Sequence, residues 1–324
     1  MRLLRLLLKT VSALVAVVLL AAMVFIAWHW APDRPLSDLT DRWAPPPSQF
    51  AEIAGMPVHY RDEGPRDAGI DAPPPLVLLH GTSDSLHAWD GWAAALAPTR
   101  RVIRFDLPGF GLTGPPADDD LTMERYREVL FALLDRLEVP RAILAGNSFG
   151  GRVAWTSAIH APERVAGLIL VSASGLVSEP VEVPAGFALA GLPGVREALR
   201  NTLPRFLVRM SLESVYGDPA RLTEAEVDRF YEITLREGNR DALIGRFRMS
   251  PAGPDVDRIA EIAVPTLILW GDADRLIPPD AAERWGAAVA GSEVVVLQGV
   301  GHVPHVESPE ASAAAALDFL NRRF

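Results

Sequence analysis

The chain has 324 residues, of which 49% are hydrophobic and 22% are charged, enough for one large globular domain with an insertion or for two smaller domains. Its formal net charge is −10, and no basic stripe with interleaved aromatic residues occurs, so we expect no nucleic acid as a partner. The absence of cysteine excludes disulfides and thiolate metal sites. Composition leaves the oligomeric state open.

The first thirty residues differ from the rest of the chain. Arg2, Arg5 and Lys9 precede a run, Thr10 to Trp30, that contains no Asp, Glu, Lys or Arg. At about 1.5 Å per residue in a helix, this run can cross a hydrocarbon core of about 30 Å. We predict a transmembrane signal anchor over residues 1–30, with the N-terminus in the cytoplasm and the remaining chain outside it. The alternative is a cleaved signal peptide and a secreted protein, although the apolar run is longer than usual for one.

Prolines mark the next segment, residues 31–49. It contains Pro32, Pro35 and the run Pro45-Pro46-Pro47. Such a composition predicts an extended, semi-rigid linker that holds the following domain away from the bilayer.

From residue 50 onward, short apolar runs alternate with helical patterns. Two strands around a tight turn near Gly55 come first. Further strands are expected at residues 76–79, 101–106, 142–145, 165–171, 266–270 and 293–297, and helices at residues 124–137 and 308–319. The last helix is expected to be capped by Ser308, with Pro309 in its first position. This alternation predicts an α/β fold with a mainly parallel, doubly wound sheet, whose functional groups lie at the carboxyl ends of the strands.

A glycine-flanked serine follows the strand at residues 142–145. Gly146-Asn-Ser-Phe-Gly150, read as strand, sharp turn and helix, is a Gly-x-Ser-x-Gly nucleophile elbow. In such an elbow Ser148 has a strained backbone that projects its Oγ, and Gly146 and Gly150 keep Cβ atoms out of the turn. Taken alone, the motif could also be an ordinary glycine-rich turn after a buried strand.

Four other motifs accompany the elbow. They are His80-Gly81, Asp106-Leu-Pro-Gly-Phe-Gly111, Gly271-Asp-Ala-Asp274 and Gly301-His302-Val-Pro304. With these motifs the chain resembles the α/β-hydrolase fold family over residues 50–324, most closely its lipase, esterase and C–C hydrolase branches. The resemblance implies an eight-stranded sheet, with the core at residues 50–176 and 265–324 and a helical cap at residues 177–264 after the sixth strand.

The serine needs a base and an acid. His302 lies in a glycine-flanked loop after the last strand and is our candidate for the base that takes the Ser148 proton. His305 is the competing base. Asp274 resembles the family's acid after the seventh strand and would orient the imidazole, whereas Asp272 is interpreted as a turn former.

The resemblance also implies an oxyanion hole. One backbone N–H should come from Phe149, directly after the nucleophile, and the other from Thr82 in the loop after residues 76–79. We interpret His80 as a residue that orders its loop and Asp106 as one that closes its own turn. The histidines lack metal-binding spacing, so we predict no metal and no cofactor.

The insertion at residues 177–264 is helical and rich in arginine. An apolar stripe runs from Val195 to Met210, although Pro204 must begin, kink or break a helix there. Thr223-Glu-Ala-Glu226 predicts a capping box. Most of the stripe should pack onto the main domain, and we predict that Phe206 and Leu207 also roof an apolar substrate pocket. Trp89 could belong to this pocket or to the core.

The favoured function is hydrolysis of carboxylic esters, with a small-molecule or lipid ester as substrate, through Ser148, His302, Asp274 and an acyl-enzyme. A serine at this position separates the chain from the related dehalogenases and epoxide hydrolases, which use aspartate. The alternatives are a C–C bond hydrolase of ring-cleavage products, a cofactor-free haloperoxidase or perhydrolase, and, remotely, an inactive binding module. Against the C–C reaction, the loop after His80 lacks the glycine-rich pattern of that branch.

Overall fold

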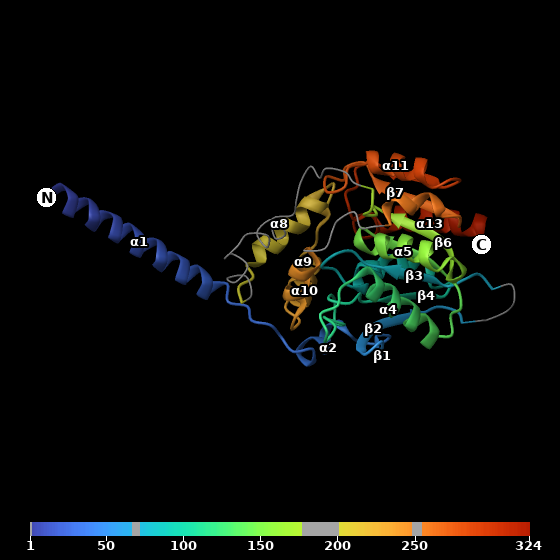
Figure 1. Cartoon of the computed structure of the whole chain (residues 1–324), viewed down its shortest axis with the longest axis horizontal. Coiled ribbons are helices and arrows are strands. Elements are labelled where there is room, and N and C mark those ends of the chain that lie inside the picture. Colours follow the sequence, from blue (N-terminus) through green and yellow to red (C-terminus); the bar gives the residue numbers. More distant parts are fainter. Residues whose placement is uncertain (1, 67–71, 177–200, 248–254) are drawn as a thin grey trace.

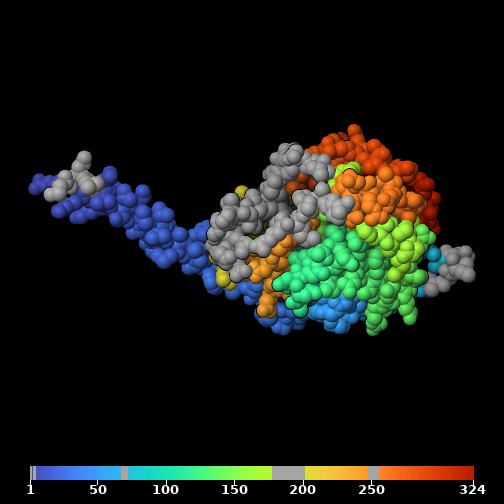
Figure 2. Space-filling view, in the orientation of Figure 1, coloured from blue at the N-terminus to red at the C-terminus, as the bar shows by residue number. Residues whose placement is uncertain are grey.

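A computed structural model of the chain describes residues 2–66, 72–176, 201–247 and 255–324. The N-terminal helix α1, Arg2–Trp28, projects from the globular part as a single rod (Figure 1). Its segment Arg5–Trp28 is apolar and long enough to cross a membrane, and none of its most apolar stretch is buried. Figure 2 shows this helix standing away from the globular part along most of its length.

The globular part is built on one sheet of eight strands in the order β1-β2-β4-β3-β5-β6-β7-β8. The strands are β1 (Gln49–Ile53), β2 (Met56–Glu63), β3 (Leu76–Leu79), β4 (Val102–Phe105), β5 (Ala142–Asn147), β6 (Val165–Val171), β7 (Thr266–Gly271) and β8 (Glu293–Leu297). Only the β1–β2 and β2–β4 pairs are antiparallel. The predicted mainly parallel sheet is therefore confirmed.

Helices cover both faces of the sheet. The helices of the hydrolase core are α3 (Asp90–Leu96), α4 (Met123–Arg136), α5 (Phe149–His160), α11 (Asp280–Ala288), α12 (Pro304–Glu307) and α13 (Pro309–Arg323), with 3-10 turns η1 (Leu86–Trp89), η2 (Pro162–Arg164) and η4 (Val256–Glu261). Side chains alternate along β3, so that Leu76 and Leu78 belong to the apolar cluster that includes α3 and α13, while Val77 and Leu79 belong to the cluster that includes α4, α5 and α11. Two apolar layers thus enclose the sheet and fix the strand ends that carry the site.

The predicted cap on the last helix needs a correction. Pro309 does begin α13, but the Ser308 side chain makes no capping hydrogen bond. The Ser308 carbonyl instead accepts the N–H of Ser312, as the backbone of a residue before a helix does whatever its side chain.

Three helices form the described part of the cap: α8 (Arg205–Val215), α9 (Glu224–Thr234) and α10 (Asn239–Phe247), with the 3-10 turn η3 (Pro219–Arg221). Pro204 stands immediately before α8 and so begins this helix. The capping box at the start of α9 is present, since Thr223 accepts the Glu226 N–H and the Glu226 side chain accepts the Thr223 N–H. Residues 195–200 of the predicted stripe lie outside the described residues.

The proline-rich segment differs from the extended spacer that its composition predicts. It contains the short helix α2, Ser37–Trp43, and it lies against the cap. The Arg34 N–H donates to the Leu235 carbonyl at 2.7 Å, and Trp43 Nε1 donates to Glu232 on α9 at 2.8 Å. Composition could not show this, because the partners are distant in the sequence: Leu235 follows Arg34 by 201 residues and Glu232 follows Trp43 by 189.

Candidate active site

Ser148 lies between β5 and α5 in a backbone conformation that is rare for a residue with a side chain. Its φ is 51° and its ψ is −113°, and its N–H donates to the Val171 carbonyl at 3.0 Å. A Cβ on Gly146 would lie 2.3 Å from the backbone of Gly150, and one on Gly150 would lie 2.2 Å from the Leu79 carbonyl oxygen. Both glycines are therefore required by space, which is the geometry expected of a nucleophile elbow.

His302 and Asp274 form a buried pair. His302 Nδ1 lies 2.8 Å from Asp274 Oδ2, and both residues have less than 5% of their surface exposed. The other carboxylate oxygen of Asp274 accepts the N–H groups of Leu276 and Ile277. A carboxylate fixed on both sides favours the tautomer in which Nδ1 carries the proton, and in that tautomer Nε2 is the proton acceptor. Nε2 is buried and has no hydrogen-bond partner in the described part of the chain.

The two backbone segments expected to bind an oxyanion lie beside Ser148. Phe149 is the first residue of α5, so its N–H has no acceptor within the helix and stands at the positive end of the helix dipole. Thr82 lies in a tight turn in which the Asp84 N–H donates to the Gly81 carbonyl. A Cβ on Gly81 would lie 3.5 Å from the Ser148 Cβ, so this turn is packed directly on the elbow.

His80 and Asp106 hold these loops together. His80 Nδ1 donates to the Gly81 carbonyl, and its Nε2 accepts the N–H of Leu107 at 2.9 Å. Asp106 accepts the Leu86 N–H at 2.7 Å and lies 2.7 Å from His59 Nδ1. Burial alone would raise the pKa of Asp106, but the charge and hydrogen bond of His59 hold that pKa below its usual range. Both residues are thus occupied in ordering their loops, as their motifs predict.

His305, the competing base, lies in α12 and is fully buried. Its ring packs on that of Trp89 at a tilt of 33°, with centroids 4.1 Å apart. Burial, followed by the nearby His302, lowers the pKa of His305 well below its usual value. Among the described residues neither ring nitrogen has a partner, so no carboxylate orients this imidazole as Asp274 orients that of His302.

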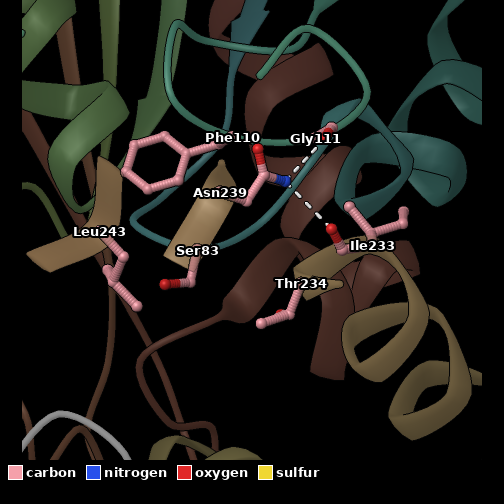
Figure 3. A pocket seen from close by; sticks show the side chains of 7 residues that line it. All are labelled: Ser83, Phe110, Gly111, Ile233, Thr234, Asn239 and Leu243. Atoms are coloured by element: carbon pink, nitrogen blue, oxygen red, sulfur yellow. Dashed lines mark hydrogen bonds between the residues drawn. The ribbon is translucent and has the colours of Figure 1, made fainter. Parts of the chain in front are cut away.

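A small pocket lies between the core and the cap, beside the turn that carries Thr82. It encloses a volume of about 10 Å³, room for about one water molecule, and is open to solvent on one side. It is lined by Ser83, Phe110, Gly111, Ile233, Thr234, Asn239 and Leu243 (Figure 3). Asn239 ties its two walls together by donating to the Gly111 and Ile233 carbonyls at 2.9 and 3.0 Å. Phe110 belongs to a motif that the sequence reveals, whereas the α9 and α10 residues carry no sequence signal for a pocket.

The predicted pocket residues lie elsewhere. Trp89 has no exposed surface and packs on Trp92 in the core, so the structure favours the core alternative. Phe206 is 47% exposed on α8, and its ring meets His29 edge-on. Leu207 on the same helix is half-buried. Within the described part of the chain, none of these three side chains lines the pocket, because α9 and α10, rather than α8, face the Thr82 turn.

A buried arginine lies over Phe149, one of the two residues expected to supply an N–H to an oxyanion. Arg246 on α10 is 9% exposed, and its guanidinium carbon stands 4.0 Å from the centre of the Phe149 ring. Burial lowers its pKa to about 10. Arg246 lies two helical turns after Asn239 and one turn after Leu243, on the same face of α10. The guanidinium group is therefore next to the pocket residues of this helix.

The described residues contain no candidate metal site. Over the described ranges, no group of three or more His, Asp or Glu side chains is placed to hold a metal ion. The prediction that the protein needs no metal or cofactor stays a prediction.

Comparison with known proteins decides the family. Residues 74–309 match the family described as the alpha/beta hydrolase fold. The chain belongs to this family. It is 33% identical over 281 residues to the dihydrolipoyllysine-residue acetyltransferase component of the acetoin cleaving system of Pseudomonas putida, covering 86% of this chain and 70% of that protein. It is 30% identical over 278 residues to the 2-hydroxymuconate semialdehyde hydrolase of Pseudomonas sp. (strain CF600), covering 82% of this chain and 91% of the relative.

Solved structures show the same fold. A meta-cleavage product hydrolase from Pseudomonas fluorescens IP01 superposes on this α/β-hydrolase with a TM-score of 0.72 at 24% identity, covering 85% of this chain and 97% of that one. A membrane phospholipase A gives a TM-score of 0.70 at 24% identity and covers 99% of both chains. The second likeness therefore extends over the N-terminal helix as well as the hydrolase core.

Proposed function

We propose that this α/β-hydrolase is a serine hydrolase of carboxylic esters, with Ser148 as nucleophile, His302 as base and Asp274 as the acid that orients it. The observation that carries the proposal is the buried Asp274–His302 pair, 2.8 Å apart, with an unpartnered Nε2, together with the strained backbone of Ser148. Ser148 Oγ attacks the ester carbonyl while its proton passes to His302 Nε2. The backbone N–H groups of Phe149 and Thr82 stabilise the oxyanion. The protonated His302 then gives its proton to the leaving alcohol, and water repeats the sequence on the acyl-enzyme.

The substrate that we propose is an apolar ester presented near a membrane. The pocket beside Thr82 is lined by the apolar side chains of Phe110, Ile233 and Leu243, which an acyl group would contact once it widened the pocket. Trp28 and Trp30 are 82% and 57% exposed at the end of α1, as is usual for aromatic residues at a bilayer surface. With α1 spanning the membrane and its basic end in the cytoplasm, the hydrolase part lies outside the cytoplasm and close to lipid.

A second candidate is the hydrolysis of a carbon–carbon bond in an acidic ring-cleavage product. Two observations favour it. The curated relatives include a 2-hydroxymuconate semialdehyde hydrolase and a 2-hydroxy-6-oxononadienedioate hydrolase. Arg246, at the end of the pocket wall, could pair with a substrate carboxylate that an apolar ester lacks.

A label and a substrate panel test these proposals. A fluorophosphonate probe should label the wild-type protein and fail to label Ser148→Ala, whereas an inactive binding module would label in neither form. Purified protein is then assayed with neutral esters of increasing acyl length and with dienone acids. Turnover of the acids in preference to the esters, lost in Arg246→Met, would favour the second candidate.

The choice of base has its own test. His302→Ala should abolish turnover, because loss of one member of a coupled triad costs about 10⁴-fold or more. His305→Leu, which replaces a ring without hydrogen bonds, should keep turnover within about tenfold of wild type. An inactive His305→Leu beside an active His302→Ala would reverse the assignment.

A further inference from the structure

Glu307 is a buried carboxylate that the proposed mechanism leaves without a role. It ends α12, five residues after His302, and is 7% exposed. Its oxygens accept three backbone N–H groups, from Gly301 at 2.7 Å, Asp218 at 2.8 Å and Gly217 at 3.0 Å. Hydrogen bonds to a charged acceptor are stronger than neutral ones, and a buried donor that is left without an acceptor destabilises the fold.

The three donors come from two separate parts of the molecule. Gly301 precedes His302 in the core, whereas Gly217 and Asp218 follow α8 in the cap. A Cβ on Gly301 would lie 2.4 Å from the Val215 carbonyl oxygen, and a Cβ on Gly217 would lie 2.8 Å from the Gly301 nitrogen. The two backbones are therefore in direct contact, and the Glu307 carboxylate joins them.

His302 is held by the same contact. Its own N–H donates to the Val215 carbonyl, in the last turn of α8, at 2.8 Å. Its carbonyl accepts the side-chain amide of Asn147, the residue before the nucleophile, at 3.0 Å. The loop of the acid is fastened to the cap as well, because Arg275, next to Asp274, donates to the Tyr216 carbonyl at 3.2 Å. The position of the base thus depends on the end of α8.

We propose that Glu307 is a positioning residue for His302: it fastens the His302 loop to the end of α8 and so makes docking of the cap a condition for a competent acid–base pair. The inference rests on the proposed function of His302. Without the carboxylate, the buried N–H of Gly301 and the part-buried N–H groups of Gly217 and Asp218 lose their acceptor, and the Gly301–His302 backbone moves to recover one. A displacement of about 1 Å at a reacting group can cost 10²-fold in rate.

The test compares Glu307→Ala and Glu307→Gln with a matched control in the full-length protein in detergent. The control is Asp62→Asn, which also removes a buried carboxylate, one that binds Arg101 through two hydrogen bonds of 2.9 Å in the antiparallel part of the sheet. With a short activated ester, Glu307→Ala should lower kcat per folded molecule by about 10–100-fold while KM changes by less than about threefold. Glu307→Gln keeps one acceptor oxygen and should lose less. Asp62→Asn should keep the wild-type kcat per folded molecule.

A spectroscopic readout separates positioning from stability. The proton between His302 Nδ1 and Asp274 should give a far-downfield resonance in the wild type and in Asp62→Asn, and a shifted or broadened one in Glu307→Gln. A wild-type kcat per folded molecule together with an unchanged resonance in Glu307→Gln would overturn the proposal. Because the resonance needs no substrate, a wild type that hydrolyses no ester would count against the proposed function alone.

Discussion

At the scale of single residues, Asp274, the proposed acid, is the candidate residue whose contacts are most fully determined by the structure. Asp274 receives two backbone N–H groups on one oxygen and the His302 ring on the other. Asp272, two positions earlier, lies at the surface, and in the described part of the chain it accepts the N–H of Gly299. The sequence Gly271-Asp-Ala-Asp274 offers both carboxylates, and the fold brings only the second of them to the imidazole.

Asp274→Asn should therefore lower kcat by about 10⁴-fold and leave the free energy of unfolding nearly unchanged. The amide can keep the backbone contacts, but its NH₂ group would face Nδ1 and leave the imidazole in the wrong tautomer. The rate is measured with a short activated ester and stability by denaturant unfolding. Asp272→Asn serves as the control and should retain most activity. Wild-type turnover by Asp274→Asn would mean that another group orients the base.

His87 gives the fold a dependence on pH. Its Nε2 donates to the Trp43 carbonyl at 2.7 Å, which joins α2 to the core. Burial, partly opposed by the charge of Asp106 and reinforced by Arg229 and Arg61, lowers the pKa of His87 to about 4. Unfolding returns this pKa to about 6.5. Between these two values the unfolded state binds more protons than the folded state, so stability falls as the pH is lowered through this window.

The free energy of unfolding should thus decrease by up to about 3 kcal/mol between pH 6.5 and pH 4 on account of His87. His87→Gln can still donate to Trp43 and cannot titrate, so part of this slope should vanish in the variant. Denaturant unfolding in detergent at several pH values measures both slopes. Parallel slopes in the two proteins would show that folding does not lower the pKa of His87.

At the scale of elements, the sequence predicts best what depends on local pattern. The strands predicted at residues 76–79, 165–171 and 293–297 have these same bounds in the structure, because apolar runs between turns leave few alternatives. The capping box at Thr223 and the elbow at Ser148 are equally local. What the sequence does not reveal depends on how the cap lies on the core. Trp89, for example, is of a residue type that often lines pockets, and the structure places it in the core.

The pocket also depends on how the cap lies on the core, and it leads to a prediction about the acyl length of the substrate. Leu243 faces the pocket from α10 (Figure 3), so Leu243→Trp should fill it and exclude longer acyl chains. Each buried methylene contributes about 0.8 kcal/mol, so losing room for two carbons should lower kcat/KM for the longer ester by roughly tenfold relative to an acetate. The assay compares esters of increasing acyl length at equal amounts of folded protein.

Phe206→Asp on α8 is the control for this experiment. Phe206 lies at the outer surface next to His29, so this variant should keep the wild-type chain-length profile. If Phe206→Asp changed the profile and Leu243→Trp did not, the acyl group would have to bind on the α8 side of the cap.

At the scale of the whole molecule, the N-terminal helix is fastened to the cap. The Leu203 N–H donates to the His29 carbonyl at 3.1 Å, and the Ala31 N–H donates to the Asn201 carbonyl at 2.9 Å, both just before α8 begins. Asp33 then binds Arg240 on α10. Figure 1 shows α1 meeting the globular part beside α8, away from the sheet. A helix that enters a bilayer would therefore place the cap next to lipid.

Two consequences can be measured together. The full-length protein should remain with membranes, and a reporter fused after Phe324 should be active only where the C-terminus is exported. A protein that begins at Ala31 keeps the contacts of Ala31 and Asp33 with the cap, so it should be soluble and hydrolyse a short soluble ester at the wild-type rate. On a long-chain ester held in vesicles it should be slower than the anchored protein, because it must first bind the bilayer.

Two outcomes would contradict these predictions. Mature protein lacking the first thirty residues would identify the helix as a cleaved signal. Equal rates on vesicles would show that the anchor fixes location without presenting substrate.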